Sequence, residues 1–345
     1  KVEAIPFVAT LRFPFATSLG PVPSLRKEVM VVVYTDEGVT GIGEVATDPY
    51  YHGETQEAIC KNIAEYIEPI MIGKDPLDIE AIIQDINSRI VGNPFTLAPI
   101  DIALHDIWGK QIGASVSQLL GGQLRSEIPL AWIVGLRERV EDMVADAVAS
   151  VRKGYQTLKI KVGTGTRQDV AIVKAVREVV GNEVEIGIDA NQAWSVKDAI
   201  KIIKDMERYD LQMVEQPVSA LNLSGMARVT RSVDTPIMAD ESVFSPETAY
   251  EVVRREAADI LNIKLAKTGG LSGARRVAAI ADAASIPCMG GSMLELGVTT
   301  AASLHFASAS KIVKYPCEIG GIEYFQRDII REELRPERGM LKVPR

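Results

Sequence analysis

The sequence predicts an α/β fold, a (β/α)₈ TIM-like barrel preceded by an N-terminal α+β capping domain. Its 345 residues, 47% of them apolar, can form two domains or one large barrel with an appendage. After Gly121-Gly122, short apolar runs alternate with amphipathic helical segments. Four successive runs end at Asp189, Glu215, Asp240 and Lys264, at intervals of 26, 25 and 24 residues. A βα unit that repeats at this interval is typical of a parallel barrel.

The first 122 residues have a different pattern, which predicts the α+β domain. Residues 28–34 predict a strand, and residues 39–45 predict its hairpin partner after a turn at 35–38. Helical spacing follows from residue 54 to about residue 120, with breaks near 73–76 and 92–94. We therefore expect a capping domain over 1–122, with the segment 320–345 packing back on it, and a barrel domain over 123–319.

Eight strand-like runs follow the boundary, as a closed barrel requires. They span residues 129–134, 157–162, 185–189, 212–215, 236–240, 259–264, 286–290 and 312–317. A doubly wound open sheet is the alternative fold, and it normally carries a glycine fingerprint after its first strand. Gly163-Thr164-Gly165 lacks the third glycine of that fingerprint because Gln168 stands in its place. The barrel is therefore favoured.

Charge and cysteine content exclude several classes of protein. Lys and Arg number 38 against 46 Asp and Glu, a net charge of −8, and no basic cluster marks a nucleic-acid interface. No apolar run approaches the roughly 18–20 residues that span a bilayer. The three cysteines form neither a zinc pattern nor a disulfide framework. We expect a cytoplasmic protein with neither nucleic acid nor membrane as a partner.

Charged residues end five consecutive predicted strands of the barrel. Function in this fold lies at those ends, on one face of the barrel. Three of the residues are carboxylates, which would repel one another there unless a cation neutralised them. All-oxygen ligands suit a hard divalent ion, Mg²⁺ before Mn²⁺ or Ca²⁺. A single such residue is more often a helix cap or an ion-pair partner, but the set is too regular for that explanation. The residues are Lys159, Lys161, Asp189, Glu215, Asp240 and Lys264.

The motifs around these residues resemble those of the enolase superfamily, and within it the muconate lactonizing enzyme subgroup. The resemblance covers nearly the whole chain. It rests on Lys159-Ile160-Lys161, Asp189-Ala190-Asn191, Glu215-Gln216-Pro217, Ala239-Asp240-Glu241-Ser242, Asn262-Ile263-Lys264 and Ser292-Met293-Leu294-Glu295.

The resemblance implies a metal-assisted proton transfer at a carbon next to a carboxylate. The residues that match the family's metal ligands are Asp189, Glu215 and Asp240, which would bind Mg²⁺, with Mn²⁺ as a possible substitute. Lys161 and Lys264 match the family's acid/base lysines on opposite faces of the substrate, and Lys159 lies beside Lys161. The family also implies a small carboxylate substrate and a homo-oligomer.

Further residues are candidates for substrate contact. We expect His105 and His305 to be structural, whereas His52 either contacts substrate or is an exposed loop residue. Glu318 either contacts substrate, caps the next turn or pairs with a barrel lysine. The full set of candidate substrate-binding residues is Asn191, Glu241, Ser292, Met293, Glu318 and His52.

The reaction depends on features outside the shared motifs. No histidine stands near the end of the seventh predicted strand, which argues against the mandelate racemase branch. Dipeptide epimerases carry an Asp-x-Asp motif where this chain has Glu318-Ile319-Gly320, which resembles the muconate cycloisomerases more. The favoured expectation is therefore cycloisomerisation of a muconate-type dicarboxylate. The alternatives are racemisation or epimerisation of N-acyl amino acids or dipeptides, dehydration of the succinylbenzoate synthase type, and a non-catalytic metal-binding scaffold.

Overall fold

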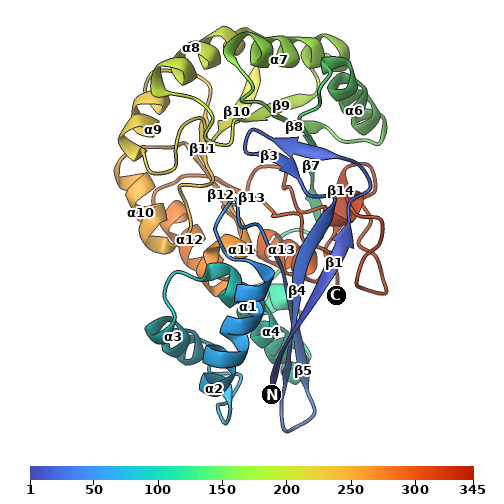
Figure 1. Ribbon diagram of the computed structural model, residues 1–345, viewed down its shortest axis with the longest axis vertical. Helices are drawn as coiled ribbons and strands as arrows, with labels where there is room; N and C mark the ends of the chain where they lie inside the picture. The colour runs from blue at the N-terminus through green and yellow to red at the C-terminus, as the bar shows by residue number, and fades with distance from the viewer.

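The protein is described here by a computed structural model that covers residues 1–345, except for the side chains at positions 15 and 166. A sheet and its helices form one end of the molecule, and a barrel forms the other (Figure 1). Among the described residues, no helix is both long enough and apolar enough to cross a membrane.

An antiparallel sheet of three strands forms the N-terminal region. The strands β1 (Val2–Thr10), β4 (Leu25–Tyr34) and β5 (Thr40–Ala46) lie in the order β1-β4-β5. Helix α4 (Pro94–Ile112) packs against this sheet so closely that a Cβ atom on Gly43 would come within 1.8 Å of the Pro99 carbonyl oxygen. Glycine is therefore required at this position of β5.

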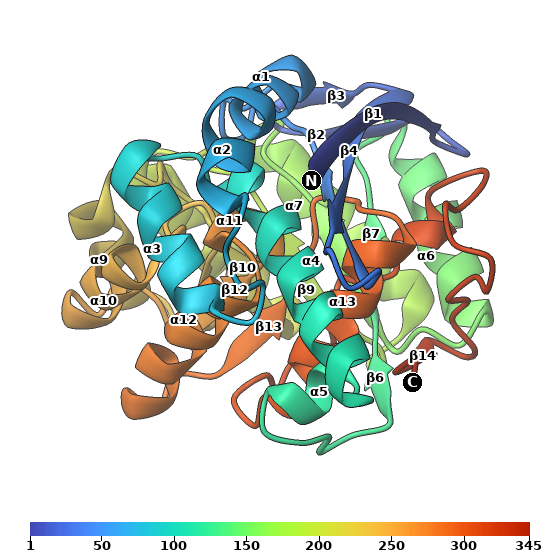
Figure 2. The same ribbon diagram turned by 90° about the horizontal axis from the view of Figure 1, so that it is seen from below.

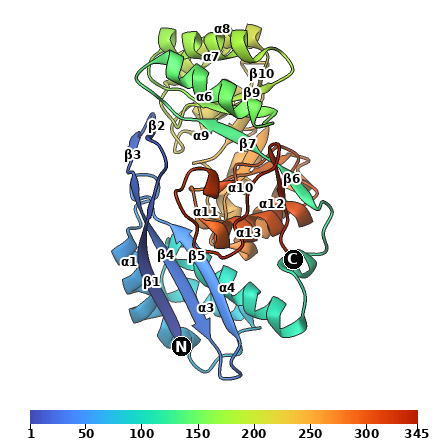
Figure 3. The same ribbon diagram turned by 90° about the vertical axis from the view of Figure 1, so that its right-hand side faces the viewer.

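A small hairpin connects β1 to β4 and reaches toward the barrel (Figure 3). It consists of β2 (Phe15–Thr17) and β3 (Gly20–Val22). The Leu136 N–H donates to the Ala16 carbonyl oxygen, and the Ser18 hydroxyl donates to the Ala190 carbonyl oxygen. The hairpin is thus held against loops at the mouth of the barrel.

The other helices of this region bury one apolar stripe each. Ile59, Ile63 and Ile67 recur at the i, i+4 spacing of one helix face and are buried with the valines of β4. The helices are α1 (Gln56–Asn62), the π-helical turn η1 (Ile63–Ile67), α2 (Glu68–Met71), α3 (Ile79–Arg89) and α5 (Val116–Leu119).

The barrel contains a parallel sheet of seven strands in chain order, surrounded by helices (Figure 2). The strands are β7 (Ala131–Val134), β8 (Thr157–Lys161), β9 (Glu185–Asp189), β10 (Leu211–Glu215), β11 (Ile237–Ala239), β12 (Ile260–Ile263) and β13 (Cys288–Gly290). The helices are α6 (Val140–Arg152), α7 (Thr166–Val180), α8 (Val196–Met206) with the 3₁₀ turn η2 (Glu207–Tyr209), α9 (Leu223–Thr230), α10 (Pro246–Arg254), α11 (Leu265–Thr268), α12 (Leu271–Ala283) and α13 (Gly297–Ala309). This arrangement confirms the predicted α/β barrel class.

The eighth predicted strand, 312–317, is not a regular strand, and this part of the prediction was wrong. Isolated bridges join Cys288 to Val313 on one side and Leu130 to Cys317 on the other, and these bridges close the ring. Pro316 lacks an N–H group, so it cannot donate to a ladder at that point. The first predicted strand, 129–134, is also divided, because β6 (Glu127–Pro129) ends before β7 begins.

The C-terminal segment 320–345 contacts both regions of the molecule. After the 3₁₀ turn η3 (Gly321–Glu323), the Arg12 N–H donates to the Tyr324 carbonyl oxygen over 2.8 Å, next to the end of β1. Farther along, β14 (Met340–Lys342) pairs antiparallel with β6, the short strand that precedes the first barrel strand.

Buried carboxylates of the N-terminal region cap two barrel helices. Glu44 on β5 accepts hydrogen bonds from the backbone N–H groups of Leu296, Val298 and Thr299 at the start of α13, over 2.6, 3.1 and 3.0 Å. Asp101 on α4 accepts from the Ser272 N–H over 3.1 Å at the start of α12. Because the first N–H groups of a helix have no partner within it, these carboxyl oxygens satisfy donors that would otherwise be unpaired, and both contacts tie the two regions together.

Glu28 on β4 is buried beside this interface and should make stability depend on pH. Neither of its carboxyl oxygens has a hydrogen-bond partner among the described residues. Burial and the neighbouring Glu44 raise the pKa of Glu28 well above its usual value of 4.5, and Arg26 only partly opposes them. Between pH 4.5 and that raised pKa, the folded protein keeps a proton that the unfolded chain has lost. Stability should therefore fall as pH rises, by up to about 1.4 kcal/mol per pH unit for this group.

Urea denaturation between pH 5 and 8 tests this expectation. Glu28→Gln should flatten the dependence of unfolding free energy on pH by about one proton. Glu57→Gln is the control, because Glu57 is exposed and its pKa is lowered to about 2 by the hydrogen bond from Lys27, so it does not titrate in this range. An equal slope for the wild type and Glu28→Gln would contradict the assignment.

Candidate active site

The sequence-predicted acid and base residues meet at one end of the barrel. Lys161 on β8 lies opposite Asp189 on β9 in the sheet register, and Asp189 lies opposite Glu215 on β10. Asp240 and Lys264 directly follow β11 and β12. All of these side chains, and that of Lys159, are buried. The sheet therefore brings together residues that lie up to about 100 positions apart in sequence.

Lys159 lies at the centre of the cluster, between three carboxylates. Its Nζ is 2.7 Å from Glu215 Oε2, 2.6 Å from Glu318 Oε2 and 3.5 Å from Asp189 Oδ2. Glu318 thus pairs with a barrel lysine, one of the roles expected from the sequence. Burial disfavours the charged form of Lys159, but the surrounding carboxylates outweigh it and hold the pKa of this lysine well above its usual value.

Lys161 and Lys264 lie on opposite sides of the barrel because β8 and β12 are separated by three intervening strands. Lys161 Nζ is 2.5 Å from Asp189 Oδ2 and 3.2 Å from Asn191 Oδ1. Lys264 Nζ is 2.7 Å from Asp240 Oδ2. Each lysine is thus held by the carboxylate that follows the neighbouring strand.

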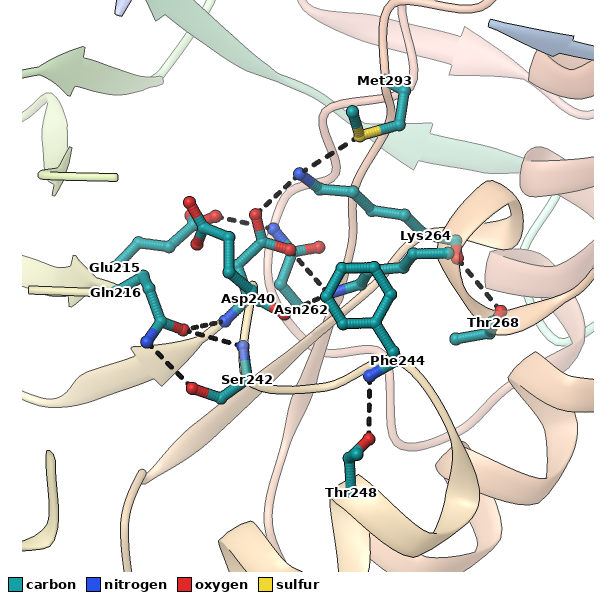
Figure 4. A network of polar contacts seen from close by, with 12 residues as sticks. Glu215, Gln216, Asp240, Ser242, Phe244, Thr248, Asn262, Lys264, Thr268 and Met293 are labelled. Atoms are coloured by element: carbon teal, nitrogen blue, oxygen red, sulfur yellow. Dashed lines mark hydrogen bonds and ion pairs between the residues drawn. The ribbon is translucent and has the colours of Figure 1, made fainter. Parts of the chain in front are cut away.

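Three residues that sequence reasoning did not single out hold these carboxylates in place, and two of them, Gln216 and Asn262, are labelled in Figure 4. Gln216 Oε1 accepts hydrogen bonds from the backbone N–H groups of Asp240 and Ser242, and Asn262 Nδ2 donates to Glu215 Oε1 over 3.0 Å. Lys267 Nζ lies 2.6 Å from Asp240 Oδ1. The sequence offered one signal for them: Gln216 and Asn262 lie within the recognised motifs, and Lys267 lies three residues after Lys264.

Gln216 adopts an unusual backbone conformation at the end of β10. Its φ angle is +35°, in the left-handed region that residues other than glycine seldom occupy. The side chain is fully buried and also donates to the Val218 carbonyl oxygen and the Ser242 hydroxyl. Strain of this kind persists where surrounding contacts determine the conformation, which is common at functional sites.

The cluster holds an excess of negative charge. Burial raises the pKa of Glu215 to about 8; Lys159 lowers it, while the carboxylates of Asp189 and Asp240 raise it further. Burial likewise raises the pKa of Glu241 to about 7, with Asp240 adding to the effect. These carboxylates therefore favour an additional positive charge nearby.

The donor atoms fit a hard divalent cation. No group of three His, Cys, Asp or Glu side chains is gathered as a formed metal site in the described part of the chain, because lysine ammonium groups lie between the carboxylates. However, Glu241 Oε2 and Asn262 Oδ1 are buried there without a hydrogen-bond partner. Buried oxygen atoms with unmet bonding capacity, next to three carboxylates, are the ligand chemistry that Mg²⁺ prefers.

A cavity of about 100 Å³ lies above the lysines. Lys159, Lys161 and Lys264 line it from the barrel, and four of the candidate substrate-binding residues line it as well. These four are Asn191, Ser292, Met293 and Glu318.

The other two candidates, His52 and Glu241, do not line this cavity. His52 packs edge-on against Phe95 and Phe244, with ring centroids 5.0 and 4.4 Å apart. Glu241 Oε1 accepts a hydrogen bond from Asn191 Nδ2 over 3.2 Å. Both border a separate hollow on the outer side of the 49–53 loop.

Arg26 also lines the cavity, and the sequence gave no motif that could have identified it. Its guanidinium is buried, donates to the Met293 carbonyl oxygen over 3.1 Å and lies 3.5 Å from Asp48. Its Nε has no hydrogen-bond partner among the described residues. Arg26 stands beside Lys27 and Glu28 in the polar first half of β4, so nothing in the sequence set it apart from its charged neighbours.

Comparison with known proteins identifies the family to which this chain belongs. Residues 1–121 match the family described as "Mandelate racemase / muconate lactonizing enzyme, N-terminal domain". Residues 142–345 match the family described as "Enolase C-terminal domain-like".

Three similar enzymes of known activity are isomerases. The chain is 40% identical to the L-Ala-D/L-Glu epimerase of Clostridium acetobutylicum, over 88% of this chain and 84% of that one. It is 36% identical to the N-succinyl-L-Arg/Lys racemase of Bacillus cereus, over 95% and 89%. It is 34% identical to muconate cycloisomerase 1 of Rhodococcus opacus, over 99% and 91%.

A solved structure of similar fold carries both metal and substrate. This structure is the dipeptide epimerase of Enterococcus faecalis in complex with Mg and the dipeptide L-Leu-L-Tyr. It matches this chain with a TM-score of 0.95 and 34% sequence identity, and the match covers 100% of this chain and 96% of that chain. The matches extend over both regions of the fold and over the site itself. The chain is therefore an isomerase that belongs to the mandelate racemase/muconate lactonizing enzyme family of the enolase superfamily.

Proposed function

We propose that this enzyme racemises or epimerises an N-acylated α-amino acid by removing and returning the α-proton. The observation that carries the proposal is the position of two lysines, Lys161 and Lys264, on opposite sides of one cavity. Inversion at carbon requires a proton to leave one face and another to arrive at the opposite face. A cycloisomerase needs only one acid of this kind.

The comparisons support this alternative better than the muconate cycloisomerisation favoured by the sequence. The epimerase and the racemase are 40% and 36% identical to this chain, and the muconate cycloisomerase is 34% identical. The expectation rested on Glu318-Ile319-Gly320, in which Glu318 pairs with the barrel lysine Lys159.

The chemistry of the proposed reaction follows from the lysines. The amine of one lysine accepts the α-proton as the C–H bond breaks, and the electron pair moves into the adjacent carboxylate to form an enolate. The ammonium of the opposite lysine then delivers a proton to the other face. Lys159, close to both Glu215 and Asp189, offsets negative charge at the base of the site.

The residues that would hold a divalent cation are Asp189, Glu215 and Asp240. Bound Mg²⁺ would act as a Lewis acid toward the substrate carboxylate, which makes the α-proton more acidic. The presence of Mg in the structure of the E. faecalis dipeptide epimerase supports this assignment. The unpartnered oxygens beside the three carboxylates support it independently.

The charges of the cavity favour an N-acyl substrate over a free dipeptide. Two carboxylates line the cavity, and each lies beside a cation, Asp48 beside Arg26 and Glu318 Oε2 beside Lys159. Only Glu318 Oε1 is left without a partner among the described residues to receive a free ammonium group. Arg26 instead presents a buried cation with an unused N–H group. This arrangement suits a second anionic group on the substrate, such as the carboxylate of an N-succinyl group.

Proton exchange in D₂O tests the proposed function directly. N-succinyl amino acids, dipeptides and cis,cis-muconate would each be incubated with the enzyme and Mg²⁺. Loss of the α-proton signal by NMR, together with loss of optical rotation for the N-succinyl substrates, is the expected result. Loss of muconate absorbance without any α-proton exchange would instead establish the cycloisomerase.

Arg26→Met should weaken substrate binding more than it slows the reaction. Because Arg26 lies at the wall of the cavity and not among the lysines, its loss removes an interaction made equally in ground and transition states. We expect KM for N-succinyl amino acids to rise by about 10-fold or more, the cost of roughly 1.4 kcal/mol, with little change in kcat. A fall in kcat at constant KM would contradict this role.

A further inference from the structure

We propose that Lys267 is a positioning residue that holds Asp240 in place, so that Lys264 can leave Asp240 and act on the substrate. This inference rests on the proposed two-lysine reaction. Lys267 belongs to none of the motifs by which the site was recognised.

The contacts of Lys267 all involve one residue. Its side chain is fully buried, and its Nζ lies 2.6 Å from both the Oδ1 atom and the backbone carbonyl oxygen of Asp240. Lys264 Nζ binds the other carboxylate oxygen, Oδ2, over 2.7 Å. The two lysines stand three residues apart around the short helix α11, so both point toward the same carboxylate.

The backbone of Asp240 is held from two directions. Gln216 accepts its N–H over 3.0 Å, and Lys267 donates to its carbonyl oxygen. The side chain has two cationic partners among the described residues, namely Lys264 and Lys267. If Lys267 were absent, Lys264 would be the sole lysine partner of Asp240, and in the metal-free protein its departure would leave an unpaired buried charge.

The opposite side of the site has the same arrangement, in which two lysines lie beside one carboxylate. Asp189 is bound by the acid/base lysine Lys161 over 2.5 Å, and the fully buried Lys159 lies 3.5 Å away. Each acid/base lysine thus shares its carboxylate with a second lysine that is buried. The second lysine keeps the carboxylate neutralised while the first one moves to the α-carbon.

Separate measurements on the two enantiomers of one substrate test the inference. The probes are N-succinyl-L-lysine and N-succinyl-D-lysine in D₂O with Mg²⁺, and Lys264→Ala identifies the enantiomer whose α-proton Lys264 removes. Lys267→Met should slow exchange of that enantiomer by about 10- to 100-fold, the usual effect of losing a supporting contact. The factor by which the exchange rate of the other enantiomer falls should be at least ten times smaller. Equal losses for both enantiomers would show a merely structural role and overturn the inference.

Lys110→Met is the matched control. Lys110 Nζ also binds one aspartate carboxylate and one backbone carbonyl oxygen, those of Asp106 and Thr40, but on the surface and far from the cavity in the fold. Its loss should leave both exchange rates unchanged. If Lys267→Met does not fold, Lys267→Gln replaces it, because the amide still donates an N–H to Asp240 without carrying charge.

A second measurement does not depend on the substrate or on metal. In a crystal structure of metal-free Lys267→Met, we expect Asp240 to turn so that both carboxylate oxygens bind Lys264. An Asp240 and a Lys264 that keep their positions would overturn the inference. Failure of the wild type to exchange any α-proton would refute the proposed function alone, since this structural result would still decide the role of Lys267.

Discussion

Lys161→Ala stops α-proton exchange for one enantiomer of the substrate, and Lys264→Ala stops it for the other. Each lysine faces the cavity from its own side of the barrel, so each can reach the α-proton of only one configuration. General acid–base catalysis by a positioned side chain contributes about 10²- to 10⁴-fold, and we expect losses of that size. Racemisation, which needs both lysines, is lost in either variant.

The measurement is the NMR rate of deuterium incorporation for each enantiomer, compared with the rate of inversion. Lys174→Ala is the control, because Lys174 lies on the outer helix α7 and pairs only loosely with Glu178, over 3.7 Å. Exchange at the parental rate in Lys161→Ala would show that another group is the base. Circular dichroism of each variant verifies that the fold is retained.

Glu215→Gln removes activity because it takes away one of the three carboxylates that would hold the metal. An amide has nearly the same shape, but it carries no negative charge toward a cation. Metal-ion catalysis supplies several kcal/mol of transition-state stabilisation, and each 1.36 kcal/mol is tenfold in rate, so the loss should be about 10³-fold or more. Treatment of the wild type with EDTA should have the same effect, and added Mg²⁺ should reverse it.

Glu251→Gln serves as the control for this variant. Glu251 is also a carboxylate with cationic partners, Arg254 and Arg255, but it lies on the exposed surface of α10. Titration of each variant with Mg²⁺ by calorimetry separates lost binding from lost chemistry. Full activity of the wild type after removal of divalent ions would refute the metal assignment to Asp189, Glu215 and Asp240.

The sequence predicted the barrel and most of the cluster because both depend on short-range periodicity. A βα unit recurs every 24 to 26 residues, and each strand ends where its apolar run stops. In a parallel barrel all strand ends lie on one face, so charged residues at those ends must converge. Lys161, Asp189 and Glu215 illustrate this, since they are register partners on adjacent strands.

The segment at 312–317 shows where periodicity was not enough. Its apolar pattern predicted a strand, but backbone hydrogen bonds decide what forms, and Pro316 cannot donate one. The choice of reaction is limited for a related reason. The strand-end motifs are shared by many reactions, whereas part of the wall of the cavity, including Arg26, comes from the N-terminal region.

The sequence alone thus determined the fold class and which charged residues stand at the strand ends, because strand periodicity and strand ends are local properties of the chain. Only the tertiary structure decided which side chains form hydrogen bonds and ion pairs with one another. Lys267 binds Asp240, Gln216 supports it from β10, and Glu44 caps α13 from a different region. Contacts of this kind join side chains that are distant in sequence, and a buried polar group must find its partner wherever the packing of the elements places one.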